Sequence, residues 1–217
     1  MPRTQVASEW ISEYRRWLSE EESMHNAQIV ANYFSALGWT PQAISAMCGN
    51  MRHESSINPD MYEYGYAWED DRGYGLVQWT PRSKYWDWAV ARGLPPRHGD
   101  SQLARIKYEV ENNIQWIPIS DYDYMTFEEF TQSTLSVPYL TEAFLWSYER
   151  PNRQAGEDSL PNRVAFAQRA FNELDFEGGP GPGPGPGPGP GPGWEAIPYF
   201  IYRRHNTNMR RMGARRR

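Results

Sequence analysis

The sequence predicts a mostly α-helical α+β domain with a small β-hairpin, followed by a Gly-Pro linker and a basic tail. Several segments repeat apolar residues at helical spacing. One stretch, 73–80, instead combines paired glycines with aromatic and β-branched residues, which is typical of a short, tightly bent hairpin. The composition then changes abruptly near residue 177. We therefore expect four parts: an N-terminal amphipathic arm (1–25), a main domain (26–177), a linker (178–193) and an aromatic-basic segment (194–217).

The first two expected helices precede the centre of the domain. Residues 8–20 read as an amphipathic helix, because Trp10, Tyr14 and Trp17 share one side with other apolar residues. Residues 26–38 repeat apolar side chains at helical spacing, and Gly38 is a suitable C-terminal stop.

A third helix is predicted to run through the centre of the sequence to Glu54. Thr40 and Pro41 supply a cap and a first-turn proline. Apolar side chains then follow the i, i+3, i+4, i+7 pattern of a core-facing helix at Ile44, Met47, Cys48 and Met51. Glu54 continues this face at the last turn, where a carboxylate is costly to ionise. A general acid needs that property near neutral pH, although a glutamate at a helix end can also simply cap nearby amides.

Further helices are expected in the second half of the main domain, where apolar residues again recur at helical spacing. These segments are 83–93, 101–116, 127–130, 140–148 and a last helix starting at Leu160-Pro161 and ending at Leu174.

Two motifs of the main domain resemble the catalytic core of the phage tail lysozyme family. They are Glu-Ser-Ser-Ile-Asn-Pro at 54–59 and Gly-Tyr-Gly-Leu-Val-Gln-Trp-Thr-Pro-Arg at 73–82. The resemblance covers roughly residues 26–174 and extends, more distantly, to goose-type lysozymes and lytic transglycosylases. It implies a lysozyme-like fold and cleavage of the β-1,4 glycosidic bond of peptidoglycan. The glutamate of the family's Glu-Ser pair is the acid, which corresponds to Glu54.

The second catalytic group is left open by the sequence. Asp71, just before the expected hairpin, lies where chicken-type lysozymes carry a second carboxylate, but it can equally be an ordinary loop acid. A nucleophile would lie about 5 Å from Glu54, and a base that holds water about 6.5–9.5 Å away. If no aspartate faces the cleft, the C6 hydroxyl of the substrate can attack and give an anhydro product. The sequence therefore does not separate a hydrolase from a transglycosylase.

Four more residues are candidates for substrate binding through the resemblance. Gln78 offers an amide to an N-acetyl group or hydroxyl. Tyr74 is suited to stack on a sugar, and Trp79 matches the cleft wall, although core packing explains Trp79 equally well. Tyr148 belongs to a Tyr-Glu-Arg-Pro motif and is expected at the cleft floor, while the Glu149-Arg150 pair that follows can be a structural ion pair.

Other chemistries have little support in the sequence. The single cysteine, Cys48, cannot form an internal disulfide and is expected to pack as a small hydrophobe. His53-Glu54 is not a zinc-protease motif, because position 57 is Ile. We expect no metal and no cofactor. Residues 1–16 contain no apolar core of a signal peptide, and no stretch has the roughly 20 apolar residues of a membrane span.

The two ends of the linker carry opposite charge. Seven of the 22 Lys and Arg residues and one of the 27 Asp and Glu residues lie beyond residue 178, which leaves a net charge of −11 before it. Seven Pro-Gly repeats separate the two parts as a spacer, since collagen needs glycine at every third position. The segment 194–217 is suited to bind other virion or tail proteins, nucleic acid or an anionic wall polymer, or it is a solubilising tail.

These features predict a lysozyme carried on a bacteriophage tail or virion, with peptidoglycan of the host cell wall as its substrate. Delivery on a particle fits an acidic enzyme, which gains no electrostatic steering toward an anionic wall. The alternative is a structural tail protein that binds glycan through a lysozyme fold without cutting it.

Overall fold

A computed structural model describes residues 9–63 and 71–176, all of which belong to one unit, residues 1–182. The linker 178–193 and the segment 194–217 lie outside the described residues. The described part is mainly helical. Its elements are the helices α1 (Glu20–Ala36), α2 (Pro41–Ser55), α3 (Ser83–Val90), α4 (Gly99–Glu111), α5 (Phe127–Gln132), α6 (Val137–Phe144) and α7 (Arg153–Glu173), with the 3-10 turn η1 (Ser120–Tyr122) and the π-helical turn η2 (Leu145–Glu149).

Helix α2 is the centre of the domain, as the sequence predicted. Thr40 caps it by accepting a hydrogen bond from the Ala43 amide, and Pro41 occupies its first turn. The apolar face that ends with Met51 is fully buried, and α2 packs against α1, α5, α6 and α7. Cys48 belongs to this buried face, and burial raises the pKa of its thiol to about 12, so it packs as a hydrophobe.

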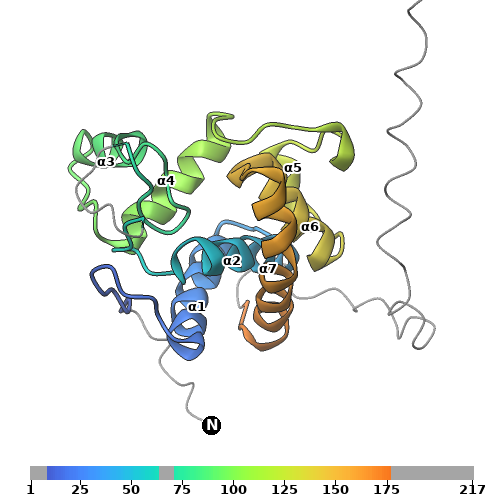
Figure 1. Cartoon of the computed structure of the whole chain (residues 1–217), viewed down its shortest axis with the longest axis horizontal. Helices are drawn as coiled ribbons and strands as arrows, with labels where there is room; N and C mark the ends of the chain where they lie inside the picture. Colours follow the sequence, from blue (N-terminus) through green and yellow to red (C-terminus); the bar gives the residue numbers. More distant parts are fainter. Residues whose placement is uncertain (1–8, 64–70, 177–217) are drawn as a thin grey trace, which may run out of the picture. The chain divides into compact units, whose positions relative to one another are not determined.

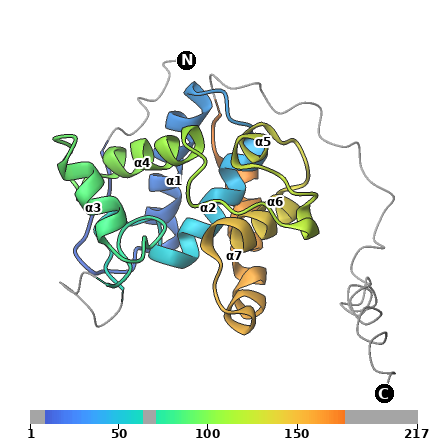
Figure 2. The same cartoon turned by 90° about the horizontal axis from the view of Figure 1, so that it is seen from above.

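The remaining helices form two groups on either side of α2 (Figures 1 and 2). Helices α3 and α4 pack together on one side. On the other side, α6 and α7 pack on each other and on α2. This arrangement leaves the C-terminal end of α2 between the two groups.

Helix α7 approaches α2 very closely at Gly49. A Cβ atom on Gly49 would lie 2.4 Å from the Arg163 carbonyl oxygen and 2.7 Å from the Ala167 Cβ atom. Glycine is therefore required for the two helices to pack at this distance. The predicted start of α7 at Leu160-Pro161 is wrong. The helix starts at Arg153, because the Asn152 side chain accepts a hydrogen bond from the Ala155 amide and caps it.

The helix expected at 8–20 is absent in the described residues 9–19, which form an irregular arm. Helix α1 begins at Glu20 instead, six residues before its expected start, because Ser19 and Glu22 form a reciprocal capping box. This motif competes with a continuous helix, since the N-cap residue has extended backbone dihedrals.

The expected hairpin at 73–80 is not confirmed. Within the described residues the segment forms a tight turn with two isolated antiparallel bridges, Tyr62–Tyr74 and Tyr74–Trp79. Gly75 takes a φ of 80° in this turn, where L side chains are strained. Gly75 therefore marks a sharp bend, and the described residues around it form only these isolated bridges.

Candidate active site

A cleft of about 1430 Å³ opens at the C-terminal end of α2. One wall is helical and comes from the last turn of α2, the end of η2 and one face of α7. The opposite wall comes from the segments 61–63 and 71–80. The arm before α1 adds Arg15 and Trp17 to the lining.

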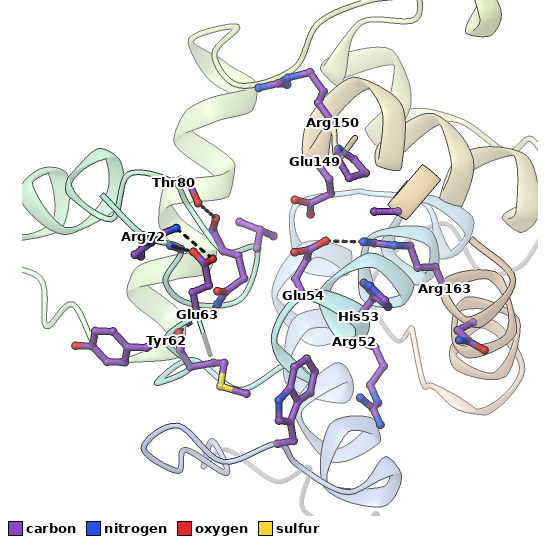
Figure 3. Close-up of a pocket in the computed structure, with 18 of the residues that line it drawn as sticks. Arg52, His53, Glu54, Tyr62, Glu63, Arg72, Thr80, Glu149, Arg150 and Arg163 are labelled. Atoms are coloured by element: carbon purple, nitrogen blue, oxygen red, sulfur yellow. Dashed lines mark hydrogen bonds and ion pairs between the residues drawn. The ribbon is translucent and has the colours of Figure 1, made fainter. Parts of the chain in front are cut away.

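Glu54 lies in this cleft, on the last turn of α2. The helix ends directly after it because Ser56 adopts the left-handed conformation, with a φ of 55°. The Glu54 side chain is 20% exposed, and its Oε1 accepts a hydrogen bond of 2.6 Å from Nη2 of Arg163 (Figure 3). The predicted position in the cleft is therefore observed, but the carboxylate has a buried cationic partner in addition to apolar neighbours.

Arg163 is held in place by α2 and α7 together. Its side chain is 2% exposed. Its Nε donates to Oγ of Ser159 at 3.1 Å and its Nη1 donates to Oδ1 of Asn50 at 3.0 Å. Asn50 is fixed in turn by hydrogen bonds from its Nδ2 to the carbonyls of Ala46 and Thr141. The guanidinium that faces Glu54 is therefore pre-positioned by two helices that pack directly on each other.

Glu149 is a second carboxylate beside Glu54, and its carboxyl group points toward that of Glu54 in Figure 3. Its Oε1 is buried, and it has no hydrogen-bond partner among the described residues. Burial, followed by the negative charge of Glu54, raises the pKa of Glu149 well above its ordinary value of 4.5, while Arg163 and Arg150 act in the opposite direction. The site therefore favours the neutral form of Glu149 more than water does.

The backbone around Glu149 explains its position. η2 is a π-helical turn at the end of α6, and such turns often re-aim side chains at functional sites. Arg150 follows in the left-handed conformation, with a φ of 53°. Its guanidinium donates to the carbonyls of Gln115 and Ser147. These contacts hold the turn at Arg150 in place. No Glu149–Arg150 ion pair is among the described interactions.

His53, the neighbour of Glu54, contributes no charge to the cleft at neutral pH. Desolvation, and then the positive charges of Arg163 and Arg52, lower the pKa of His53 to about 4. The cations of this wall are therefore arginines.

The opposite wall carries Gln78 and Asp71, both of which line the cleft. Gln78 adopts a φ of 48°, and its Nε2 donates to the carbonyls of Gly75 and Met61, at 2.9 and 3.2 Å. Its amide donors thus hold the tight turn together. The Asp71 side chain is 79% exposed and lies 3.9 Å from Nε of Arg72.

Three residues expected to contact the substrate are buried and do not line the cleft. Tyr74 and Tyr148 are fully buried, and Trp79 is 3% exposed. The Tyr74 hydroxyl donates to Asp60. The Trp79 and Tyr148 side chains both donate to the buried Glu109. The structure therefore assigns them to the core behind the cleft, because their polar atoms are satisfied there and direct stacking on a sugar is closed off.

Arg163 is not among the residues that the sequence patterns indicate, and Glu149 is indicated only as a member of a structural ion pair. A signal for Arg163 exists in its spacing, since it lies on the same face of α7 as the buried Ser159, Phe166 and Ala167. Glu149 was flagged by its motif, but only the fold brings it to Glu54 from 95 positions away. Among the described residues no cluster of three or more His, Cys, Asp or Glu side chains is placed to hold a metal ion. No described helix is both long enough and apolar enough to cross a membrane.

The mostly helical domain with its open cleft is consistent with a lysozyme-like protein. The chain belongs to the phage tail lysozyme family, whose model matches residues 25–174. It is also similar to Morphogenesis protein 1 of Bacillus phage B103, with 45% identity over 162 residues, which cover 75% of this chain and 42% of the relative. The chain thus spans less than half the length of this relative.

Proposed function

We propose that the protein is a virion-associated lysozyme that cleaves the β-1,4 glycosidic bond of bacterial peptidoglycan during infection, with Glu54 as the general acid. The observation that carries the proposal is the juxtaposition of Glu54 and Glu149 in a cleft that is large enough for a glycan strand. Membership of the phage tail lysozyme family supports the reaction class.

The two carboxyl groups supply the proton as a pair. Two neighbouring carboxylates in a partly desolvated site resist ionising together, so we propose that the pair shares one proton. We assign this proton to Glu149, whose pKa is raised by burial and by the charge of Glu54, while Glu54 is paired with Arg163. Glu54 is the partly exposed member of the pair, so we assign to it the delivery of the proton to the glycosidic oxygen. Glu149 supplies that proton, and Arg163 fixes the orientation of Glu54.

The group that attacks the sugar lies on the opposite wall or on the substrate itself. Asp71 lines the cleft and is well exposed, which suits a base that holds a water molecule. In the other route the C6 hydroxyl of the sugar attacks, and no second protein carboxylate is needed. Gln78 lines the same wall, and its amide oxygen is suited to position an N-acetyl group.

The test uses purified cell walls and two proteins, the wild type and Glu54→Gln. The wild type should clear the walls, and Glu54→Gln should be slower by at least about a hundredfold, the lower end expected for the loss of a general acid. Mass spectrometry of the products separates the two routes: reducing ends indicate hydrolysis, and anhydro ends indicate attack by the C6 hydroxyl. Clearance by Glu54→Gln at the wild-type rate would remove Glu54 from the mechanism.

A second candidate function is a structural protein that binds glycan without cutting it. The Glu54–Arg163 ion pair favours this candidate, because it occupies one oxygen of the proposed acid. The relative in phage B103 bears the name of a morphogenesis protein. This candidate predicts that the wild-type protein sediments with purified walls and releases no soluble fragment.

We further propose that the segment 194–217 anchors the enzyme to its particle or to an anionic partner. The charge division across the linker supports this role. A peptide of this segment should bind tail components, nucleic acid or wall polymer at low salt and release them as salt rises. An apolar docking mode through its aromatic residues would instead survive high salt.

A further inference from the structure

The arm 9–19 forms a part of the cleft that the proposed reaction does not use. It precedes the segment matched by the family model, which starts at residue 25. Two of its side chains, Arg15 and Trp17, line the same cleft as Glu54. The arm has no helix or strand of its own, so its placement depends on side chains of the domain.

Two buried asparagines hold the arm in place. Asn26 forms a two-way bond with the backbone of Ile11, accepting from its amide at 2.9 Å and donating to its carbonyl at 2.8 Å. Asn58 binds Glu13 in the same manner and also donates to the carbonyl of Arg16 at 2.8 Å. Leu18, near the end of the arm, is only 3% exposed and anchors this end of the arm in the core. The backbone on both sides of Trp17 is thus fixed by other residues, while Trp17 itself stays half-exposed.

Trp17 differs from the tryptophans that stabilise the fold. Its side chain is 49% exposed, whereas Trp39, Trp79 and Trp116 are between 3% and 7% exposed. The indole is therefore held on a fixed backbone with about half of its surface open to solvent in the cleft. Its flat apolar face and polar edge are suited to a pyranose ring, which also has one apolar face and polar edges.

Arg15 brings a cation into the same cleft through an unfavourable backbone conformation. Its φ is 56°, in the left-handed region that arginine rarely adopts. Its amide donates to the carbonyl of Asp60 at 3.2 Å, which fixes the turn. Its guanidinium lies 6.0 Å from the centre of the Tyr14 ring, and no carboxylate among the described residues lies within ion-pair distance of it. Strain of this kind is found at binding sites, where it serves to present a side chain.

We propose that Trp17 and Arg15 form a glycan subsite in which the indole stacks on a pyranose ring and the guanidinium binds a carboxylate carried by that strand. The ligand class is an acidic amino-sugar polymer, in which a carboxylic acid ether substitutes alternate sugars. The inference rests on the proposed function for the identity of the polymer. Because the arm lies outside the catalytic wall, the subsite adds affinity only for strands long enough to reach from Glu54 to Trp17.

The experiment measures equilibrium binding by calorimetry to the full chain carrying Glu54→Gln, which is expected to slow turnover at least about a hundredfold. The ligands are wall glycan strands of two and eight sugars. Trp17→Ala should weaken binding of the eight-sugar strand about tenfold and leave the disaccharide unchanged, since an aromatic contact of this kind is worth up to roughly a factor of ten. Trp17→Phe should restore most of the affinity. Tyr124→Ala is the matched control, because Tyr124 is 65% exposed and does not line the cleft.

A second ligand separates the roles of the two residues. Chito-oligosaccharides of eight sugars lack the carboxylate, so Arg15→Gln should weaken binding of the wall glycan severalfold and leave chito-oligosaccharide binding unchanged. Equal affinity of Trp17→Ala and its parent for the eight-sugar strand would overturn the subsite, as would an equal loss for both strand lengths. A subsite confirmed by length dependence, in a wild-type chain that fails to cut walls, would disprove the proposed reaction but not the binding site.

Discussion

Two buried glutamates on different elements, Glu109 and Glu149, differ in how completely their carboxyl groups are hydrogen-bonded. The Glu109 side chain is 1% exposed, yet its carboxylate accepts hydrogen bonds from Trp79 Nε1, Arg105 Nε and the Tyr148 hydroxyl, at 2.9, 2.8 and 2.5 Å. Glu149 has a buried oxygen without a hydrogen-bond partner among the described residues. Burial raises the pKa of both groups, but only that of Glu149 is raised further by the charge of Glu54 as the next largest cause.

The difference separates a structural carboxylate from a reactive one. Each donor around Glu109 comes from a different part of the chain, so its network ties α4 to the turn at Trp79 and to η2. Glu149 has no such donor for its buried Oε1, and it lies next to a second carboxylate. A buried acid whose hydrogen bonds are complete stabilises the fold, whereas one left incomplete beside a cleft is a candidate for chemistry.

The largest expected effect is the loss of the satisfied carboxylate. Glu109→Ala should reduce the free energy of unfolding by about 3–5 kcal/mol, because it leaves Arg105 and two buried donors without their acceptor. Thermal unfolding should show a midpoint lower by roughly 6–20 °C for a domain of this size. A variant that melts within two degrees of the wild type would show that the network is not what holds α4 to the cleft wall.

Removal of the Glu54 carboxylate should have the opposite effect: it should reduce activity and leave stability nearly unchanged. Glu54→Gln should lower wall cleavage by at least about a hundredfold, equivalent to about 2.7 kcal/mol of barrier, with little change in the melting temperature. The amide keeps the shape of the carboxylate and can still accept from Arg163. Parallel loss of activity and of folded structure would instead give Glu54 a structural role like that of Glu109.

Glu149→Gln should change the pH dependence of both stability and activity. Because the fold raises the pKa of Glu149, the neutral form contributes full stability below about pH 4.5, and this contribution is lost as the pH rises through the folded pKa. Gln is permanently neutral, so the variant should be the more stable protein at pH 8, with a gap in melting temperature that narrows toward pH 5. The matched control Glu157→Gln, on the surface of α7, should show no such trend in excess of its small salt-bridge effect.

Glu149→Gln also tests whether Glu54 and Glu149 share a proton. Without the proton on Glu149, the cleft retains only Glu54 beside Arg163, so the rate should fall and the alkaline limb of the pH–rate profile should move to lower pH. Wall clearing measured from pH 4 to 9 checks this expectation. An unchanged profile would assign Glu149 to packing alone.

The smallest effect is expected from truncation after the domain. Deletion of residues 178–217 should leave the cleavage of soluble glycan fragments unchanged, because the Pro-Gly repeat has no apolar residues to add to a core. The melting temperature should also stay within a few degrees. A drop of several degrees would show that the C-terminal segment packs on the domain.

Much of the fold was predictable because it follows from local rules. The cap at Thr40, the proline at position 41 and the apolar face ending at Met51 determined α2 and placed Glu54 at its last turn. The arm and the start of α7 were mispredicted for a local reason as well. The caps at Ser19–Glu22 and Asn152 determine where these helices start, but the predicted starts followed the spacing of apolar residues instead.

The sequence by itself determined the central helix, the position of its glutamate and the charge division across the linker. The tertiary structure decided which side chains surround that glutamate. Arg163 and Glu149 come from elements about 100 residues away. Arg163 reaches Glu54 because Gly49 allows α7 to pack directly on α2, and Glu149 reaches it from the π-helical turn η2. The tertiary structure also decided which aromatic residues are accessible. Tyr74, Trp79 and Tyr148 are buried in the core, whereas Trp17 is half-exposed. Such outcomes depend on contacts between distant segments, which no local spacing of residues encodes.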